Sequence, residues 1–137
     1  MKFSRQTAIV GIGATEFSKN SGRTPMQLAT ECSLKACEDA GIEPSLINGI
    51  SVFSAEKNTE IEVARNLGIP ELTFFSMIHH GGGAPGGVIQ QAAMAVDSGV
   101  ADYVLVYRAF NERSWHRFGT GVQGRHQSPE AFDVSFS

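Results

Sequence analysis

The residues best placed to do chemistry form the run His-His-Gly-Gly-Gly-Ala-Pro-Gly-Gly at positions 79–87. Five of these nine residues are glycine, so the backbone can turn sharply and pass close to a bound molecule. An apolar segment precedes the run and a helical pattern follows it, an arrangement that commonly builds an anion or oxyanion site. The run contains no Cys, Ser or Lys. It therefore predicts a binding turn without a nucleophile.

The binding residues predicted at this turn are those whose backbone N–H groups would meet a ligand oxygen. They are Gly82, Gly83, Ala84 and Gly86. A tight turn that merely needs glycine is the competing interpretation. Glycine in the first turn of a helix is costly unless something comes close to it, which favours function.

His79 and His80 are the candidate catalytic side chains beside the turn. Alternation along a strand would direct only one of them into the site. A histidine at a strand end is more often a structural hydrogen-bonding residue, and here it would at most orient a substrate. No histidine pair has zinc-ligand spacing with a nearby Cys or carboxylate, so we predict no metal site.

Strand and helix patterns alternate around this turn. Apolar, β-branched runs predict strands over 7–12, 49–53, 72–78 and 102–107, and amphipathic or small-residue patterns predict helices over 25–40, 59–67 and 88–98. This order predicts a layered βαβαβαβ α/β fold, with a mostly parallel central sheet and helices on both faces. We expect one α/β domain over 1–108, with an irregular segment over 109–137 that leads to an absent remainder.

Composition narrows the functional class. The net charge of -3 and the isoelectric point near 5.8 do not favour nucleic acid or an anionic membrane surface. No apolar run approaches the length of a membrane span. Cys32 and Cys37, five residues apart on one predicted helix, suit neither a disulfide nor a metal pair. These features predict a cytoplasmic protein.

Several motifs together carry a family resemblance. They are Ala-Ile-Val-Gly-Ile-Gly-Ala-Thr-Glu-Phe at 8–17, Ala-Cys-Glu-Asp-Ala-Gly-Ile at 36–42, Asn-Gly-Ile at 48–50, Gly-Ala-Pro-Gly-Gly at 83–87 and the segment 95–106. Over about residues 7–108 the chain resembles the N-terminal portion of the thiolase superfamily. It is most similar to the branch of sterol carrier protein X and lipid-transfer proteins, which includes aldolases that shorten steroid side chains.

One position departs from the thiolase pattern. Gly83 stands where thiolases carry their nucleophilic cysteine, so an acyl-enzyme cannot form there. The resemblance implies retro-aldol cleavage of a β-hydroxyacyl-CoA, with coenzyme A as part of the substrate and no covalently bound cofactor. It places the acid and base residues largely in an absent second half, so we expect this chain alone to be inactive.

The resemblance also implies partners. It predicts a homodimer across the strand that begins at Leu72 and ends at Ile78, and a small subunit with an OB-like, acyl-CoA-associated domain. Two other functions stay open. One is a non-catalytic acyl-CoA or lipid-binding protein, and the other is a chain that only completes a partner's fold. Arg108 could contact an anionic ligand, although packing of its segment on a partner is preferred.

Overall fold

The computed structural model describes residues 6–54, 56–79 and 82–114. The elements follow in the order α1 (Pro25–Ala40), the 3-10 turn η1 (Pro44–Leu46), β1 (Gly49–Phe53), α2 (Glu60–Leu67), β2 (Phe74–Ile78), α3 (Ala84–Asp97) and β3 (Val104–Tyr107). Within the described residues none of these helices is long and apolar enough to cross a membrane.

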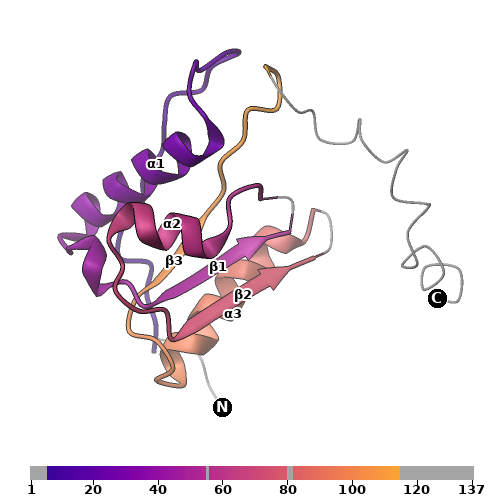
Figure 1. The fold of residues 1–137 in the computed structure, drawn as a ribbon. Coiled ribbons are helices and arrows are strands. Elements are labelled where there is room, and N and C mark those ends of the chain that lie inside the picture. The colour runs from indigo at the N-terminus through magenta and orange to yellow at the C-terminus, as the bar shows by residue number, and fades with distance from the viewer. Residues whose placement is uncertain (1–5, 55, 80–81, 115–137) are drawn as a thin grey trace, which may run out of the picture.

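The sheet is parallel, with the strands in the order β2-β1-β3. α3 packs against all three strands, whereas α1 packs against α2 and β3. Figure 1 shows α2 in front of the sheet and α3 behind it. The fold is therefore the layered α/β arrangement that the alternating pattern predicts, with helices on both faces.

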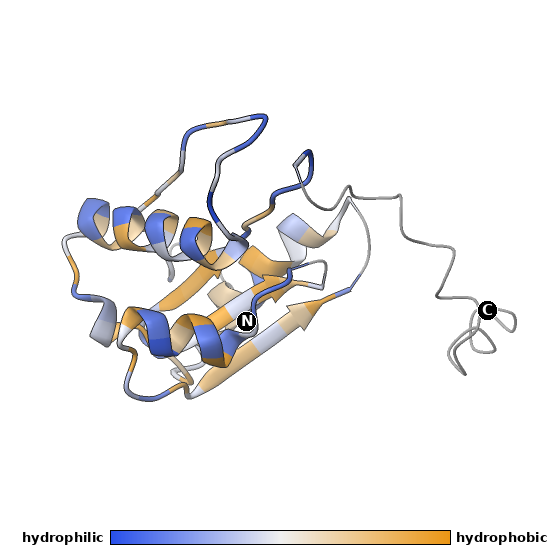
Figure 2. Cartoon of the chain, turned by 45° about the horizontal axis from the view of Figure 1, so that its top comes forward, coloured by the Kyte–Doolittle hydropathy of each residue, from blue (hydrophilic) through white to orange (hydrophobic). Residues whose placement is uncertain are grey.

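The central strand β1 explains where the core lies. All five of its residues are buried, because both neighbouring strands and both helical layers cover it. Ile50 and Val52 pack there with Val63 of α2 and Leu105 of β3. Figure 2 shows the apolar residues gathered on the strands and on the helix faces turned toward them.

Local sequence sets the bounds of the first two helices. Thr24 and Thr59 each accept a hydrogen bond from the third helical residue, and that residue's side chain bonds back to the cap. Such reciprocal capping satisfies two N–H groups that a helix start leaves free. α1 ends at Gly41, whose φ of 67° is the left-handed conformation that glycine adopts without steric penalty.

The predicted strand over 7–12 is wrong. The segment is extended but belongs to no strand of the sheet, and Ile9 and Ile12 are largely exposed. The Ile12 N–H donates instead to Asp39 Oδ2 at 2.9 Å. A Cβ added at Gly11 would lie 2.2 Å from the carbonyl oxygen of Ala36. Glycine thus lets this backbone lie on α1, and the described order is αβαβαβ rather than βαβαβαβ.

The helix after the glycine turn begins earlier than its apolar pattern. α3 starts at Ala84 rather than at Val88 and ends at Asp97. Proline at position 85 fits the first helical turn, where a missing N–H removes no hydrogen bond. Of the predicted irregular segment, residues 109–114 contain no helix or strand. The rest of it, 115–137, lies outside the described residues.

Candidate functional site

The candidate site lies at the carboxyl edge of the sheet. All three strands are parallel, so Phe53, Ile78 and Tyr107 end their strands on the same side. Figure 1 shows the three strand ends and the start of α3 on this side. Ligands of open parallel sheets bind at this edge, because loops and helix starts converge there. The predicted glycine turn therefore occupies the position expected of a binding loop.

The start of α3 has no side-chain cap among the described residues. Gly83 precedes the helix with φ −81° and ψ −17°. The first hydrogen bond of the helix runs from the Gly87 N–H to the Gly83 carbonyl oxygen at 3.3 Å. The Gly86 N–H comes before it and so has no acceptor within the helix. Free N–H groups and the helix dipole favour an anionic oxygen at this point.

The glycines of the turn differ in what surrounds them. A Cβ added at Gly82, Gly83 or Gly86 would meet nothing within 4 Å, whereas one at Gly87 would lie 3.2 Å from Ile78 Cγ2. Close packing against β2 therefore explains why residue 87 is glycine. Ala84 differs again, because it is only 1% exposed and its methyl group points into the protein. Of the predicted binding residues, Ala84 is the one that the structure buries, whereas Gly82, Gly83 and Gly86 are exposed.

His79 follows β2 directly and is exposed. No hydrogen bond or ion pair joins it to another described residue, so nothing in this part of the chain orients its ring. His80 lies outside the described residues. The described chain also contains no group of three or more His, Cys, Asp or Glu that could hold a metal ion.

Neither cysteine replaces the missing nucleophile. Cys32 and Cys37 lie on α1, and burial raises the pKa of both thiols. A reactive cysteine needs the opposite shift, toward the thiolate. Cys32 Sγ donates to the Ala29 carbonyl oxygen at 3.3 Å. Both are therefore inert packing residues, as their spacing on one helix predicts.

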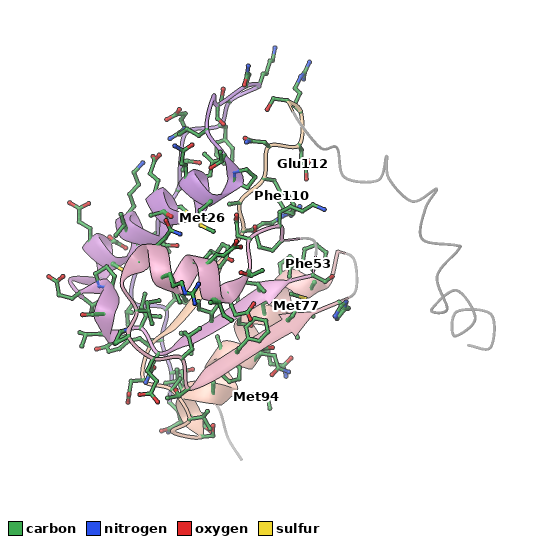
Figure 3. All side chains as sticks on the ribbon, in the orientation of Figure 1. Met26, Phe53, Met77, Met94, Phe110 and Glu112 are labelled. Carbon is green, nitrogen blue, oxygen red and sulfur yellow. The ribbon has the colours of Figure 1, made fainter. Side chains whose placement is uncertain are left out.

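Arg108 lies at the same edge, just after β3. Its guanidinium carbon is 4.6 Å from the ring centroid of Phe110 and 5.8 Å from that of Phe53. It also pairs with Glu112 at 3.3 Å. Figure 3 shows Phe53, Phe110 and Glu112 in this region. The cation is thus already engaged by aromatic faces and a carboxylate of its own chain.

Glu56 is a site residue that no sequence pattern marked. Its Oε1 accepts from the Asn58 side chain at 2.8 Å, and its Oε2 accepts from the Ala109 N–H at 2.8 Å. One carboxylate thus joins the loop after β1 to the segment after β3. Burial, and then the charge of Glu56, raise the pKa of Tyr107. Tyr107 is therefore neutral at ordinary pH.

A cavity of about 1040 Å³ lies elsewhere. The segment 6–19, α1, β3, the segment 108–114 and one side of α3 line it, and no residue of 79–87 does so. Ile9, Ile12 and Val106 border it and are exposed. The cavity therefore reaches Tyr107 and Arg108 at the carboxyl edge but does not include the glycine turn.

No protein-family model matches the chain. Over 130 residues it is 55% identical to a steroid side-chain-cleaving aldolase of Thermomonospora curvata, covering 95% of this chain and 33% of that protein. Over 116 residues it is 61% identical to the 17-hydroxy-3-oxo-4-pregnene-20-carboxyl-CoA lyase of Mycobacterium tuberculosis, covering 85% and 30% respectively. The chain spans about a third of the length of these curated relatives.

Solved structures give the same result. An Ltp2-ChsH2(DUF35) aldolase matches with a TM-score of 0.81 and 53% identity, over 94% of this chain and 32% of that one. A monomeric SCP2-thiolase-like protein of Mycobacterium smegmatis matches with a TM-score of 0.59 and 25% identity, over 72% and 22%. A priming β-ketosynthase with 24% identity and a TM-score of 0.54, over 64% and 27%, shares the fold alone.

The fold is that of thiolase-like α/β proteins. Within that class, the chain is similar to about a third of the length of steroid side-chain aldolases.

Proposed function

We propose that this chain forms part of a lyase that cleaves a β-hydroxyacyl-CoA by a retro-aldol reaction, with a steroid side chain as the acyl group. The observation that carries the proposal is the uncapped start of α3 at exposed Gly83, the position at which the resemblance to thiolases puts their nucleophile. The names of relatives 55% and 61% identical to this chain support it. Coenzyme A takes part only as the thioester of the substrate.

The turn would act on the thioester carbonyl. The N–H groups of Gly83 and Gly86 would donate to its oxygen, and their bonds strengthen as negative charge develops there. A base removes the proton of the β-hydroxyl, and that oxygen forms a carbonyl. The bond between the α and β carbons then breaks, and its electron pair forms the thioester enolate. Protonation of the enolate at carbon yields the shortened acyl-CoA.

The described residues do not supply the acid and base for these proton transfers. His79 is exposed and unpartnered among them, so we assign it at most a role in orienting the substrate. We place the proton-transfer groups in the part of the protein beyond this chain. We infer that the chain alone binds thioesters weakly and does not turn them over.

We propose two protein partners. The structure that matches over 94% of this chain is an Ltp2-ChsH2(DUF35) complex, and we infer that this chain likewise takes a small partner subunit with an OB-like domain. We also propose a homodimer across β2. That strand is one of the two outer strands of the described sheet, and its Phe75 and Met77 are 43% and 39% exposed. An exposed apolar edge strand is a template for pairing with a second copy.

A second candidate function rests on the same turn. A non-catalytic acyl-CoA carrier would use the free N–H groups of α3 to hold the thioester and need no acid or base. The lack of an oriented titratable side chain at the turn, within the described residues, is the observation that favours it. Binding without turnover would identify this function.

The test uses the full-length protein with its partner subunit. It is given a β-hydroxyacyl-CoA, and the products are measured with and without free coenzyme A. We expect a ketone or aldehyde and a shortened CoA ester in both conditions. Strict dependence on added coenzyme A would contradict the aldol route and favour thiolysis. Stoichiometric binding with no product would instead support the carrier function.

A further inference from the structure

Hydrogen bonds beyond the strands join the carboxyl ends of all three. The Ser54 N–H, just after β1, donates to the carbonyl oxygen of Ile78 at the end of β2 at 2.9 Å. The Glu56 N–H donates back to the Phe53 carbonyl oxygen, also at 2.9 Å. The Ala109 N–H, after β3, donates to Glu56 Oε2 at 2.8 Å. The loop after β1 therefore contacts the ends of both neighbouring strands.

Glu56 makes the link to β3 with its side chain. The last paired residues of β1 and β3 are Val52 and Tyr107, so Ala109 lies beyond the paired part of the sheet. Ala109 is nevertheless only 4% exposed, and a buried backbone N–H needs an acceptor. The Glu56 carboxylate provides that acceptor at the point where strand pairing has ended.

The other carboxylate oxygen orders the loop itself. Glu56 Oε1 accepts from the Lys57 N–H at 3.0 Å, from the Asn58 N–H at 3.3 Å and from the Asn58 side chain at 2.8 Å. The Asn58 carbonyl oxygen accepts from the Tyr107 hydroxyl group at 3.4 Å. The loop is thus bonded to β3 and the segment after it at two points, and one carboxylate is central to both.

The same loop contacts the residue from which the glycine turn begins. Ile78, the acceptor of the Ser54 N–H, is the last residue of β2 and directly precedes the run 79–87. Its side chain also lies against the other end of that run, because a Cβ added at Gly87 would be 3.2 Å from Ile78 Cγ2. No side chain among the described residues caps the start of α3. The position of the turn therefore depends on Ile78 and on the loop bonded to it.

We propose that Glu56 is a positioning residue for the glycine turn. By fixing the loop after β1 against β3, its carboxylate keeps Ile78 in place, and with it the N–H groups of Gly83 and Gly86. The proposal rests on the function proposed above, in which these groups donate to the thioester oxygen. Such donors must be accurately placed, and a shift of about 1 Å can lower the rate about 100-fold. Glu56 acts through the loop and not on the substrate.

The experiment uses Glu56→Gln in the full-length protein with its partner subunit. Glutamine has nearly the same size, but its amide nitrogen cannot accept a hydrogen bond, so either Ala109 or Asn58 loses its acceptor. With a β-hydroxyacyl-CoA we expect kcat to fall at least about 10-fold while KM changes by less than about 3-fold, because the donors act mainly on the charge that develops in the reaction. An unchanged kcat, or a change in KM alone, would overturn the proposal.

Asp39→Asn is the matched control. Asp39 Oδ2 also accepts a backbone N–H, that of Ile12, at 2.9 Å, but it lies near the end of α1 that leads to the start of β1, away from the carboxyl edge. We expect this variant to keep its kcat and KM. An equal loss of kcat in both variants would show that Glu56 contributes only to general stability, and it would overturn the positioning role while leaving the aldol activity intact.

Amide hydrogen exchange of the substrate-free protein tests the positioning without any reaction. In Glu56→Gln we expect at least about 10-fold faster exchange of the Ser54 and Gly87 N–H groups, which donate to Ile78 and Gly83. In Asp39→Asn both should exchange at the wild-type rate. A wild-type protein without lyase activity would contradict the proposed function, and exchange then decides the role of Glu56 by itself. Unchanged exchange in Glu56→Gln would overturn that role.

Glu56→Asp is the second variant, for the case that the glutamine variant does not fold. Its side chain is one methylene group shorter, so one carboxylate can no longer reach Asn58 and Ala109 together. We expect the same direction of change in kcat and in the exchange of the Ser54 and Gly87 N–H groups. Wild-type values of both in a folded Glu56→Asp protein would overturn the proposal.

Discussion

The three α-helices of the described residues begin in two different ways. α1 and α2 start at Thr24 and Thr59, whose side chains and capping boxes occupy the first N–H groups. α3 starts at Gly83 with no side-chain cap among the described residues. The capped start of α2 lies at the same carboxyl edge, because α2 follows β1 as α3 follows β2. Two helix starts are thus closed by their own side chains, and we propose that the third is left open to a ligand.

The largest expected effect comes from adding a capping side chain at the start of α3. Gly83→Asp would place a carboxylate where α3 presents its free N–H groups and positive end. It should occupy those donors and repel the enolate, so we expect kcat of the full-length enzyme to fall about 100-fold or more. Steady-state kinetics on a β-hydroxyacyl-CoA measure this. Unaltered kcat with unaltered thermal stability would show that these N–H groups do not contact the substrate.

Glycine at the end of α1 offers the next contrast. Gly41 has a φ of 67°, so Gly41→Ala should cost about 1–2 kcal/mol of the free energy of unfolding. Gly86→Ala, where nothing crowds the new methyl group, should add about 0.4–1 kcal/mol. Urea unfolding of the full-length protein gives both values. Equal destabilisation by the two substitutions would mean that Gly86 is also needed for its conformation.

Removing a cap tests the closed starts directly. Thr59→Ala should lower the free energy of unfolding by about 1 kcal/mol, because it leaves the Glu62 N–H without its acceptor. Activity should stay as it is, since the hydrogen bonds of Thr59 go to Glu62 and not to the glycine turn. Thr59→Ser keeps the hydroxyl group and serves as the control. A loss of kcat in Thr59→Ala without loss of stability would break the division between structural and ligand-binding helix starts.

The smallest expected effect depends on pH. The Thr59 N–H and then its hydroxyl group lower the pKa of Glu62 below 4.5. A pKa lowered by folding means that ionised Glu62 stabilises α2 above the unfolded pKa, and that this contribution is lost as the pH falls through the folded one. Glu62→Gln should flatten stability over this acidic range, because glutamine already fills the same role in α1 at Gln27. Unfolding curves recorded at pH 3 to 6 give the free energy of unfolding as a function of pH. The same pH dependence in Glu62→Gln and in the unmodified protein would contradict this prediction.

Local signals predicted most of the fold. Thr24 with Pro25, the glycine after each of the first two helices and the apolar run of β3 mark elements that the structure places within a few residues. The strand prediction for 7–12 was wrong because an apolar, β-branched pattern indicates a preference for extended backbone but does not determine which strand the segment pairs with. It is extended, yet its neighbour is α1, and only the close approach at Gly11 reveals this.

The site could be predicted only in part. The glycine run and its place before a helix are local features, and it is the resemblance to thiolases that puts their nucleophile at the position of Gly83. The role of Glu56 could not be predicted from the sequence. Its hydrogen bond to Ala109 spans 53 residues, and neither residue lies in a recognisable sequence motif. The contact of Gly87 with Ile78 likewise depends on how α3 lies across β2. Long-range pairings of this kind follow from topology, not from spacing.

The open surroundings of Gly83 have an evolutionary consequence. Its backbone is right-handed and exposed, and an added side chain would touch nothing within 4 Å. The scaffold can therefore accept a different residue at this position without repacking. A single codon change could therefore alter the chemistry of this turn and leave the packing of the described residues unchanged. The residue at position 83 can therefore change under selection for reaction type without a cost to folding of the described residues.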